Sequence, residues 1–257
     1  VGGIAELVND DGTMMRMPEF SALAEREGLA LLTIEDLIAW RRQHDPVVEA
    51  EPLPLPGERV HATSVADLPT AHGTFRIHGY RDMRTGAEHV ALVPVGVEEP
   101  HEVPVVRVHS ECLTGDAFGS LRCDCGPQLE ASMETVAREG GAVVYLRGHE
   151  GRGIGLLAKI AAYELQDAGR DTVQANLDLG WPADRREYGG AAAILVDLGL
   201  QRVRLLTNNP AKSTGLAAHG VEVTETVRLE VGHSHHNERY LRTKKELMGH
   251  VLDTVVA

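Results

Sequence analysis

Short apolar runs with the character of strands follow one another after residue 58. They cover residues 74–78, 89–95 and 105–109, and Gly, Pro and acidic turn residues separate them. Runs of this length bounded by turn residues predict strands. We therefore expect a mostly antiparallel sheet that leads into the residues after position 109.

The period of the apolar positions changes after residue 125. Apolar residues recur at helical spacing from 129 to 137 until a Gly-Gly pair stops them at 140–141, and residues 142–146 form a short buried-looking strand. Helices and strands alternate from there on. The expected helices lie at residues 155–167, 189–198 and 211–219, and the expected strands at 202–206 and 221–227. This alternation predicts a mixed α/β domain whose first half is rich in antiparallel strands.

The first 45 residues contain only short elements. We expect a strand over 4–8, an Asp-Asp-Gly turn at 10–12, and a helix over 18–27 that Gly28 ends. Thr33 and Asp36 have the spacing of a capping box at the start of a second helix. Such a segment is too small for an independent domain.

Alternating prolines separate this segment from the rest. Pro46, Pro52, Pro54 and Pro56 favour an extended, semi-rigid spacer. We therefore place a linker at residues 46–57, between a segment at 1–45 and a larger domain at 58–257. Because the chain begins without Met, inside an expected strand, we expect it to be part of a longer polypeptide.

Composition narrows the class of protein. Of the 257 residues, 43% are apolar, which is enough for a real core, and no apolar run has membrane-spanning length. The net charge of −13 argues against nucleic acid or an anionic membrane as a partner, since both are bound through clustered Lys and Arg. Three cysteines without a secretory segment fit a reducing cytoplasm.

All three cysteines, Cys112, Cys123 and Cys125, lie in one short stretch. Thiolates are soft donors that suit zinc, and three protein ligands leave a fourth position open for water, as in catalytic zinc sites. The alternatives are a redox pair, a disulfide or buried apolar side chains. His109 could also complete the site as a fourth ligand and make it structural.

A glycine-rich loop at residues 148–155 lies between an expected strand and an expected helix. Glycines let the backbone approach a ligand, and Arg152 offers paired donors to phosphate. The glycine spacing is not that of a dinucleotide fingerprint. The loop is therefore either an anion site or a plain turn.

Further positions have both a structural and a functional interpretation. Asp184 and Glu187 have the spacing of a capping box, and Tyr163 shares a helical face with Leu156 and Ile160, which favours core packing. Lys212 follows a strand end and a turn, where lysine can meet phosphate. The histidines at 233, 235 and 236 could bind metal, although a solvated turn is the stronger interpretation.

Six ordered motifs within residues 60–252 closely resemble GTP cyclohydrolase II. They read R-V-H-S-E-C-L-T-G-D-A-F-G-S-L-R-C-D-C-G-P-Q-L, E-G-R-G-I-G-L, A-Y-E-L-Q-D-A-G-R-D-T-V-Q-A-N, D-R-R-E-Y, L-L-T-N-N-P-A-K and Y-L-R-T-K-K-E-L-M-G-H. Residues 1–45 resemble the carboxyl-terminal tail of 3,4-dihydroxy-2-butanone 4-phosphate synthase. Only Glu6 falls at a position which that second family uses in its active site, so we predict no such activity.

The resemblance implies roles for individual residues. Cys112, Cys123 and Cys125 match the ligands of one zinc ion per chain, which activates water for attack on the guanine ring. Arg186 matches a nucleophile toward the α-phosphate, Asp184 a proton acceptor and Tyr163 a residue that completes ring opening. Because guanidinium stays protonated far above neutral pH, a purely electrostatic role for Arg186 is the alternative.

The resemblance also implies contacts with GTP. The matching positions are Arg107, Val108, His109, Ser110, Glu111, Gln128, Glu150, Gly151, Arg152, Thr172, Thr207 and Lys212. Magnesium is implied with the leaving pyrophosphate. One departure is Arg147-Gly148-His149, where the family has Arg-Gln, one residue fewer, so base recognition or loop shape is expected to differ there.

The resulting expectation is a cytoplasmic, homodimeric zinc enzyme of riboflavin biosynthesis. It would convert GTP to 2,5-diamino-6-(5-phosphoribosylamino)pyrimidin-4(3H)-one, formate and pyrophosphate. The alternatives are a paralogue that takes a related nucleotide or stops at a formylated intermediate, and a non-catalytic binding module stabilised by zinc. A zinc nucleobase deaminase is excluded because its H-x-E and P-C-x-x-C elements are missing.

Overall fold

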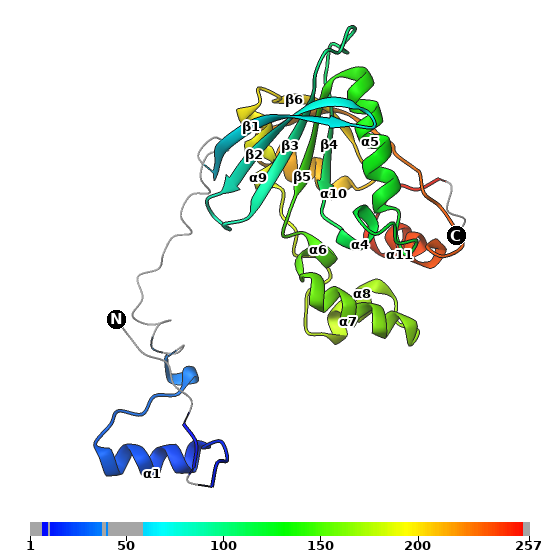
Figure 1. Ribbon diagram of the computed structural model, residues 1–257. Helices are drawn as coiled ribbons and strands as arrows, with labels where there is room; N and C mark the ends of the chain where they lie inside the picture. The colour runs from blue at the N-terminus through cyan, green and yellow to red at the C-terminus, as the bar shows by residue number, and fades with distance from the viewer. Residues whose placement is uncertain (1–6, 10, 38–39, 41–58, 254–257) are drawn as a thin grey trace. The chain divides into compact units, whose positions relative to one another are not determined.

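The chain divides into two units, Val1–Leu53 and Pro54–Ala257. The computed structural model describes residues 7–9, 11–37, 40 and 59–253. Several expectations concern residues outside these ranges: the linker at 46–57, Glu6, Asp10, and the strand over 4–8 apart from its last two residues. Figure 1 shows the elements of each unit.

The first unit contains α1 (Met17–Glu27), which ends as expected at Gly28 with a left-handed φ of 64°. The capping box is also confirmed: Thr33 N donates to Asp36 Oδ2 at 3.2 Å, and Asp36 N donates to Thr33 Oγ1 at 2.9 Å. Residues 34–37 are helical. No residue of α1 is buried.

The second unit is built on one seven-stranded mixed sheet, so the expected α/β class is confirmed. Its strand order is β1-β2-β3-β5-β4-β6-β7. The strands are β1 (Val60–Thr70), β2 (Gly73–Asp82), β3 (Glu88–Pro94), β4 (Val105–Ser110), β5 (Gly141–Leu146), β6 (Arg202–Leu206) and β7 (Glu222–Val227).

The sheet changes direction at β5. Strands β1, β2, β3 and β5 pair antiparallel, whereas β5, β4, β6 and β7 pair parallel. The expected antiparallel start is confirmed for β2 and β3 but wrong for β4, which pairs parallel with both neighbours. Helices connect the parallel strands, as parallel pairing requires.

The helices of the second unit differ in length. They are α4 (Leu113–Asp116), α5 (Cys125–Glu139), α6 (Glu150–Gly153), α7 (Leu156–Asp167), α8 (Thr172–Asp178), α9 (Gly189–Asp197), α10 (Pro210–Ala217) and α11 (Glu238–Met248). The expectations over 129–137, 155–167, 189–198 and 211–219 correspond to α5, α7, α9 and α10. Among the helices of the described ranges, none combines the length and apolar character of a membrane crossing.

Side chains that alternate along the central strands build a core on each face of the sheet. Val105 and Val143 pack with Val136 of α5 on one face. On the other face Val106 and Val144 pack with α9, whose residues from Gly189 to Leu195 are all buried. Helices on both faces leave the edge formed by the strand ends as the place for a site.

Candidate functional site

Three neighbouring parallel strands, β5, β4 and β6, end at one edge of the sheet. The cysteine stretch follows β4, the glycine-rich loop follows β5, and the Thr207-Asn-Asn-Pro turn follows β6. Ligands of open α/β sheets bind outside the carboxyl ends of the strands. Three motifs that are distant in the sequence therefore meet at the position where this fold class places a ligand.

A cavity that is partly open to solvent occupies this edge. Every residue that the sequence analysis assigned to the metal, the substrate or the chemistry lines it, except Val108 and Asp184. The side chain of Val108 is fully buried in the core. Its carbonyl accepts a hydrogen bond from Lys212 Nζ at 2.7 Å. The expected contact between Val108 and a substrate stays a prediction.

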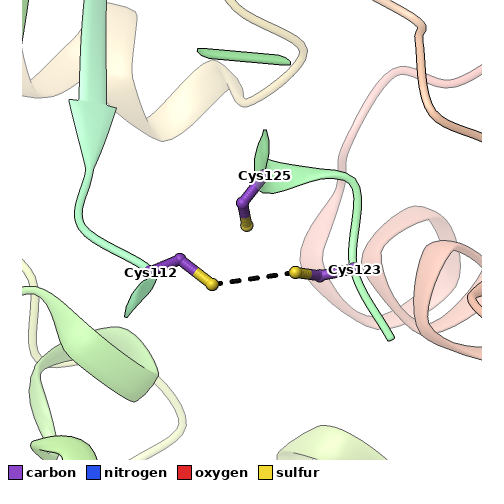
Figure 2. A group of neighbouring side chains, drawn as sticks. All are labelled: Cys112, Cys123 and Cys125. Atoms are coloured by element: carbon purple, nitrogen blue, oxygen red, sulfur yellow. Dashed lines mark hydrogen bonds between the residues drawn. The ribbon is translucent and has the colours of Figure 1, made fainter. Parts of the chain in front are cut away.

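The three cysteine side chains converge at the rim of α4 and α5 (Figure 2). Their sulfur atoms all lie within 4.8 Å of one another, and Cys112 Sγ lies 3.7 Å from Cys123 Sγ. All three cysteines are free, so the disulfide alternative is wrong. A Cβ added at Gly115 would lie 2.8 Å from Cys123 Sγ and 3.2 Å from Cys112 Sγ. Glycine at 115 therefore keeps open the space between the thiols.

The electrostatics of this cluster fit a cation. Hydrogen bonds from Cys123 and Cys125 lower the pKa of Cys112, and the nearby Lys159 ammonium adds to that effect. The same shared hydrogen bonds, together with burial, raise the pKa of Cys125. Three thiols packed this closely cannot all ionise unless a cation compensates them, and soft thiolate donors suit zinc.

Lys159 of α7 is a site residue that the sequence analysis missed. Its Nζ lies 3.2 Å from Cys112 Sγ, 2.9 Å from Thr114 Oγ1 and 2.5 Å from Glu150 Oε1. Although burial opposes its charge, Cys112 and Glu150 raise the pKa of Lys159. The spacing of four residues between Lys159 and Tyr163 places both on one helix face, and this pattern could have identified Lys159.

Tyr163 lies beside the cysteines rather than in the core. Its hydroxyl is 3.1 Å from Thr114 Oγ1, and Ile160 on the supposed buried face is 51% exposed. The interpretation of Tyr163 as a core residue is therefore wrong. Burial raises the pKa of its hydroxyl, which favours the neutral, hydrogen-bonding form.

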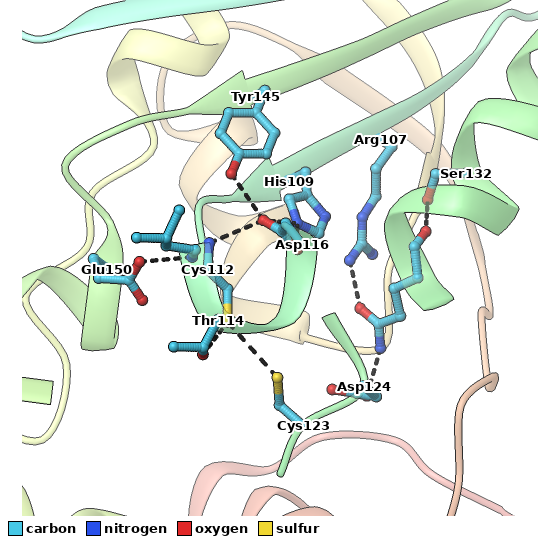
Figure 3. Close-up of polar contacts among 12 residues, drawn as sticks. Arg107, His109, Cys112, Thr114, Asp116, Cys123, Asp124, Ser132, Tyr145 and Glu150 are labelled. Carbon is cyan, nitrogen blue, oxygen red and sulfur yellow. Dashed lines mark hydrogen bonds and ion pairs between the residues drawn. The ribbon is translucent and has the colours of Figure 1, made fainter. Parts of the chain in front are cut away.

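Asp116 organises the wall behind the thiols (Figure 3). It accepts hydrogen bonds from Tyr145 Oη at 2.8 Å and from the backbone N of Cys112 at 2.9 Å. His109 Nε2 lies 3.0 Å from Asp116 Oδ1. His109 thus points to a carboxylate, and the metal-capable group among the described residues comprises the three cysteines alone. The alternative in which His109 closes the metal site is not supported.

The cavity is also rich in cationic side chains. Arg107, Arg152, Arg186, Lys212 and Lys244 all line it. Burial lowers the pKa of Lys212 well below its ordinary value, and the charges of Arg107 and Arg186 lower it further. Cations that repel one another in a buried cavity favour an anionic ligand.

Arg152 is the most constrained of these cations. It is the only non-glycine residue of the described ranges with a positive φ, 68°, and both of its Nη atoms are buried without a hydrogen-bond partner. Backbone strain and an unpaired buried guanidinium each cost free energy, and both are typical of functional sites. The interpretation of the 148–155 loop as an anion site is thereby favoured over a plain turn.

Asp184 reaches the site through Arg186. Arg186 donates from Nε to Asp184 Oδ1 at 2.9 Å and from Nη2 to Oδ2 at 2.6 Å. Although burial opposes its charge, the hydrogen bonds to Asp184 raise the pKa of Arg186. The guanidinium is therefore protonated.

The capping-box interpretation of Asp184 and Glu187 is wrong. Helix α9 begins at Gly189, and Glu187 Oε2 accepts from the backbone N of Gly189 at 3.0 Å. Glu187 also accepts from Nη1 of the buried Arg59 at 2.8 Å. These contacts fix the end of the loop that carries Asp184 and Arg186.

The histidines have separate surroundings. His149, at the departure from the family pattern, lies with Nδ1 3.1 Å from Ser110 Oγ and lines the cavity. His235 and His236 lie ring to ring, with centroids 3.7 Å apart. Neither they nor His233 belong to a metal-capable group in the described part of the chain.

The fold and the site together define a class: an α/β protein with a thiol cluster that could hold a metal ion in a cavity lined by cationic side chains. The family model described as GTP cyclohydrolase II matches residues 60–228, and the chain belongs to this family. A second model, described as 3,4-dihydroxy-2-butanone 4-phosphate synthase, matches residues 1–40.

Curated relatives are similar to the chain along nearly its whole length. The riboflavin biosynthesis protein RibBA of Salinispora tropica is 55% identical over 98% of this chain and 60% of its own length. RibBA of Nocardia farcinica is 53% identical over 98% of this chain and 58% of its own. The chain thus spans less than two thirds of the length of these relatives.

A solved structure is also similar, described as RibBX, a two-domain 3,4-dihydroxy-2-butanone 4-phosphate synthase from A. baumannii. It is 24% identical and covers 87% of this chain and 53% of its own, with a TM-score of 0.41. A similarity at this level carries no argument about the arrangement of the present chain.

Proposed function

We propose that this chain hydrolyses GTP to 2,5-diamino-6-(5-phosphoribosylamino)pyrimidin-4(3H)-one, formate and pyrophosphate, the first step of riboflavin biosynthesis. Membership of the GTP cyclohydrolase II family and the names of the RibBA relatives support this assignment. The observation that carries it is that one cavity holds both the three thiols and the unpaired guanidinium of Arg152. A nucleoside triphosphate has a base for the first and phosphates for the second.

The residues at the thiol end fit a zinc ion. Cys112, Cys123 and Cys125 would hold it in the space that Gly115 leaves open. When bound there, zinc supplies Lewis acidity, which lowers the pKa of a coordinated water toward neutrality. Lys159 offsets the negative charge of the thiolates, and Tyr163 can donate a hydrogen bond to the opening ring.

Positive charge in the cavity would hold the triphosphate. Arg152 and Lys212 would bind phosphate oxygens. Arg186 keeps its proton because it donates hydrogen bonds to both carboxylate oxygens of Asp184. A protonated guanidinium is a poor nucleophile, so we favour an electrostatic role for Arg186 at the α-phosphate. Asp184 then holds Arg186 in position.

The remaining assignments complete the proposal. Magnesium would accompany the pyrophosphate, held mainly by phosphate oxygens, since among the described residues the cysteines alone form a metal-capable group. We also propose a homodimer in the cytoplasm. The 3,4-dihydroxy-2-butanone 4-phosphate synthase match covers residues 1–40 only, and we propose no such activity for this chain.

Product analysis tests the proposal. Zinc-loaded chain is incubated with GTP and magnesium, and the products are identified by mass spectrometry beside a Cys123→Ser control. Formate, pyrophosphate and the diaminopyrimidine are expected, with all three lost in the control. A formylated pyrimidine alone would indicate the paralogue that stops early. Unchanged GTP with zinc fully bound would favour the binding module.

A further inference from the structure

The carboxyl-terminal helix α11 forms part of the cavity wall. Tyr240, Lys244 and Met248 of this helix line the cavity, as does His250 just beyond its end. The backbone N of Val251 donates to the carbonyl of Asn208 at 2.9 Å, which ties this segment to the turn after β6. The motif at residues 240–250 therefore lines the cavity, although the proposed chemistry gives its residues no role.

Lys244 of α11 forms an ion pair with the loop that carries Cys123 and Cys125. Its Nζ lies 2.6 Å from Asp124 Oδ1, and the two side chains are only 12% and 3% exposed. Asp124 is the residue between Cys123 and Cys125. A buried carboxylate needs a charge partner, and Lys244 supplies it.

Hydrogen bonds extend from Asp124 through Gln128 to Arg107. Asp124 Oδ2 accepts a hydrogen bond from Gln128 Nε2 at 2.6 Å, and Gln128 Oε1 accepts one from Arg107 Nη2. Figure 3 shows this row of contacts from Arg107 to Asp124. The amide of Gln128 thus has its NH₂ directed to Asp124 and its oxygen to Arg107. Lys244 holds the Asp124 carboxylate in place, so it also sets the orientation of Gln128.

We propose that Lys244 is a positioning residue for the GTP site. Acting through Asp124, it orients Gln128 and holds the loop that carries Cys123 and Cys125, which makes α11 a part of the active site. This inference rests on the proposed function, since Gln128 and the cysteines matter to turnover only if GTP is the substrate. A merely structural role is the rival, because Lys244 Nζ also lies 4.5 Å from the centre of the Tyr240 ring.

Steady-state kinetics of the zinc-loaded full chain separate the two roles. The variants are Lys244→Met, Lys244→Arg, Asp124→Asn and the double variant Lys244→Met with Asp124→Asn. Arg242→Met is the matched control, since Arg242 lies on the same helix in an exposed pair with Glu238. Zinc content and the unfolding midpoint are measured for each, and rates are expressed per bound zinc.

Lys244→Met is expected to lower kcat/KM about tenfold or more, because a supporting contact is lost. Lys244→Arg should recover most of this loss, and Arg242→Met should match the wild type. The double variant should lose little more than the worse single variant, because both act through one contact. If Lys244→Met does not fold, Lys244→Gln takes its place.

Two results would overturn the inference alone: wild-type kcat/KM in Lys244→Met, or losses that add fully in the double variant. In both cases an active wild type would leave the proposed function standing. An inactive wild type would overturn the proposed function and the inference with it.

Discussion

Lys159 brings one ammonium within 3.2 Å of a thiol, a hydroxyl and a carboxylate at once. Its positive charge offsets the negative charges of the Cys112 thiolate and the buried Glu150 carboxylate. Without Lys159, both negative charges would lie in low-dielectric surroundings with no charge partner. The side chain therefore couples the metal end of the cavity to the glycine-rich loop.

Replacing Lys159 with Met should lower GTP turnover about tenfold or more, since outer contacts of metal ligands have effects of that order. The free energy of unfolding should fall by roughly 3 kcal/mol, because Glu150 is left as an unpaired buried charge. Turnover assays and urea denaturation check both effects. Arg81→Met, in an exposed pair with Glu88, is the control. Unchanged turnover in Lys159→Met would contradict the charge-offset argument.

His149 makes stability depend on pH. Burial, reinforced by the charges of Arg186 and Lys212, lowers its pKa to about 3 from an ordinary value of 6.5. Below pH 6.5 the unfolded chain takes up this proton and the folded chain does not, so stability falls as pH falls toward 3. The slope from this group should be up to about 1 kcal/mol per pH unit, since the side chain is partly exposed.

Urea denaturation of the wild type and of His149→Gln between pH 6.5 and 5 measures this slope. The variant should show the shallower fall, because the remaining pH dependence comes from groups common to both chains. Equal slopes in the two proteins would exclude His149 as a source of the dependence.

At the scale of elements, α6 has an unfavourable backbone conformation at Arg152. Gly151 has φ 58° and Arg152 has φ 68° within this short helix. Glycine tolerates such angles, whereas arginine is strained by them. The strain positions the Arg152 guanidinium in the cavity.

Arg152→Gly should therefore separate stability from binding. Relief of strain and removal of an unpaired buried cation should keep the unfolding free energy unchanged or raise it by about 1 kcal/mol. The KM for GTP should rise about tenfold or more, because a charge-assisted contact to phosphate is lost. Calorimetric unfolding and steady-state kinetics give the two quantities. A variant that is less stable yet has wild-type KM would contradict the assignment.

The elements that the sequence predicts are those whose own residues determine them. Helices α5 and α9 and strands β2, β5 and β6 have apolar positions that match their buried faces. Strand β1 was missed because eight of its eleven residues are exposed, so its sequence has no alternation of buried and exposed positions. Helices α4 and α6 were missed because distant groups hold them: the backbone N of Leu113 donates to Glu150 Oε2 at 2.7 Å.

The site divides in the same way. The three cysteines were predicted as one cluster because thiols are rare and were close in sequence. Lys244 and Asp124 are 120 residues apart, and their contact depends on how α11 packs. Helix α8 could have been predicted, because Asp171 caps it by accepting from the backbone N of Val173 and Gln174. Contacts between residues distant in sequence depend on tertiary packing, so the local sequence pattern does not predict them.

At the scale of the whole molecule, the cavity belongs to the second unit alone. Its lining residues run from Arg107 to His250, all within Pro54–Ala257. In that unit a hydrophobic cluster packs on each face of the sheet. A unit with its own core can fold alone.

A chain beginning at Pro54 should therefore fold cooperatively and turn over GTP within about threefold of the full chain. Circular dichroism during heating and the turnover assay check this. Loss of activity in a folded, zinc-loaded short chain would mean that residues 1–53 contribute to the site.

The central claim is that one zinc ion in the three-cysteine cluster and the cationic cavity act on the same GTP. Zinc is removed with a chelator and returned in steps while GTP turnover and bound zinc are measured in the same samples. Turnover should rise in proportion to bound zinc and reach its plateau at one ion per chain. Full turnover without zinc, or none with one zinc bound, would contradict the account.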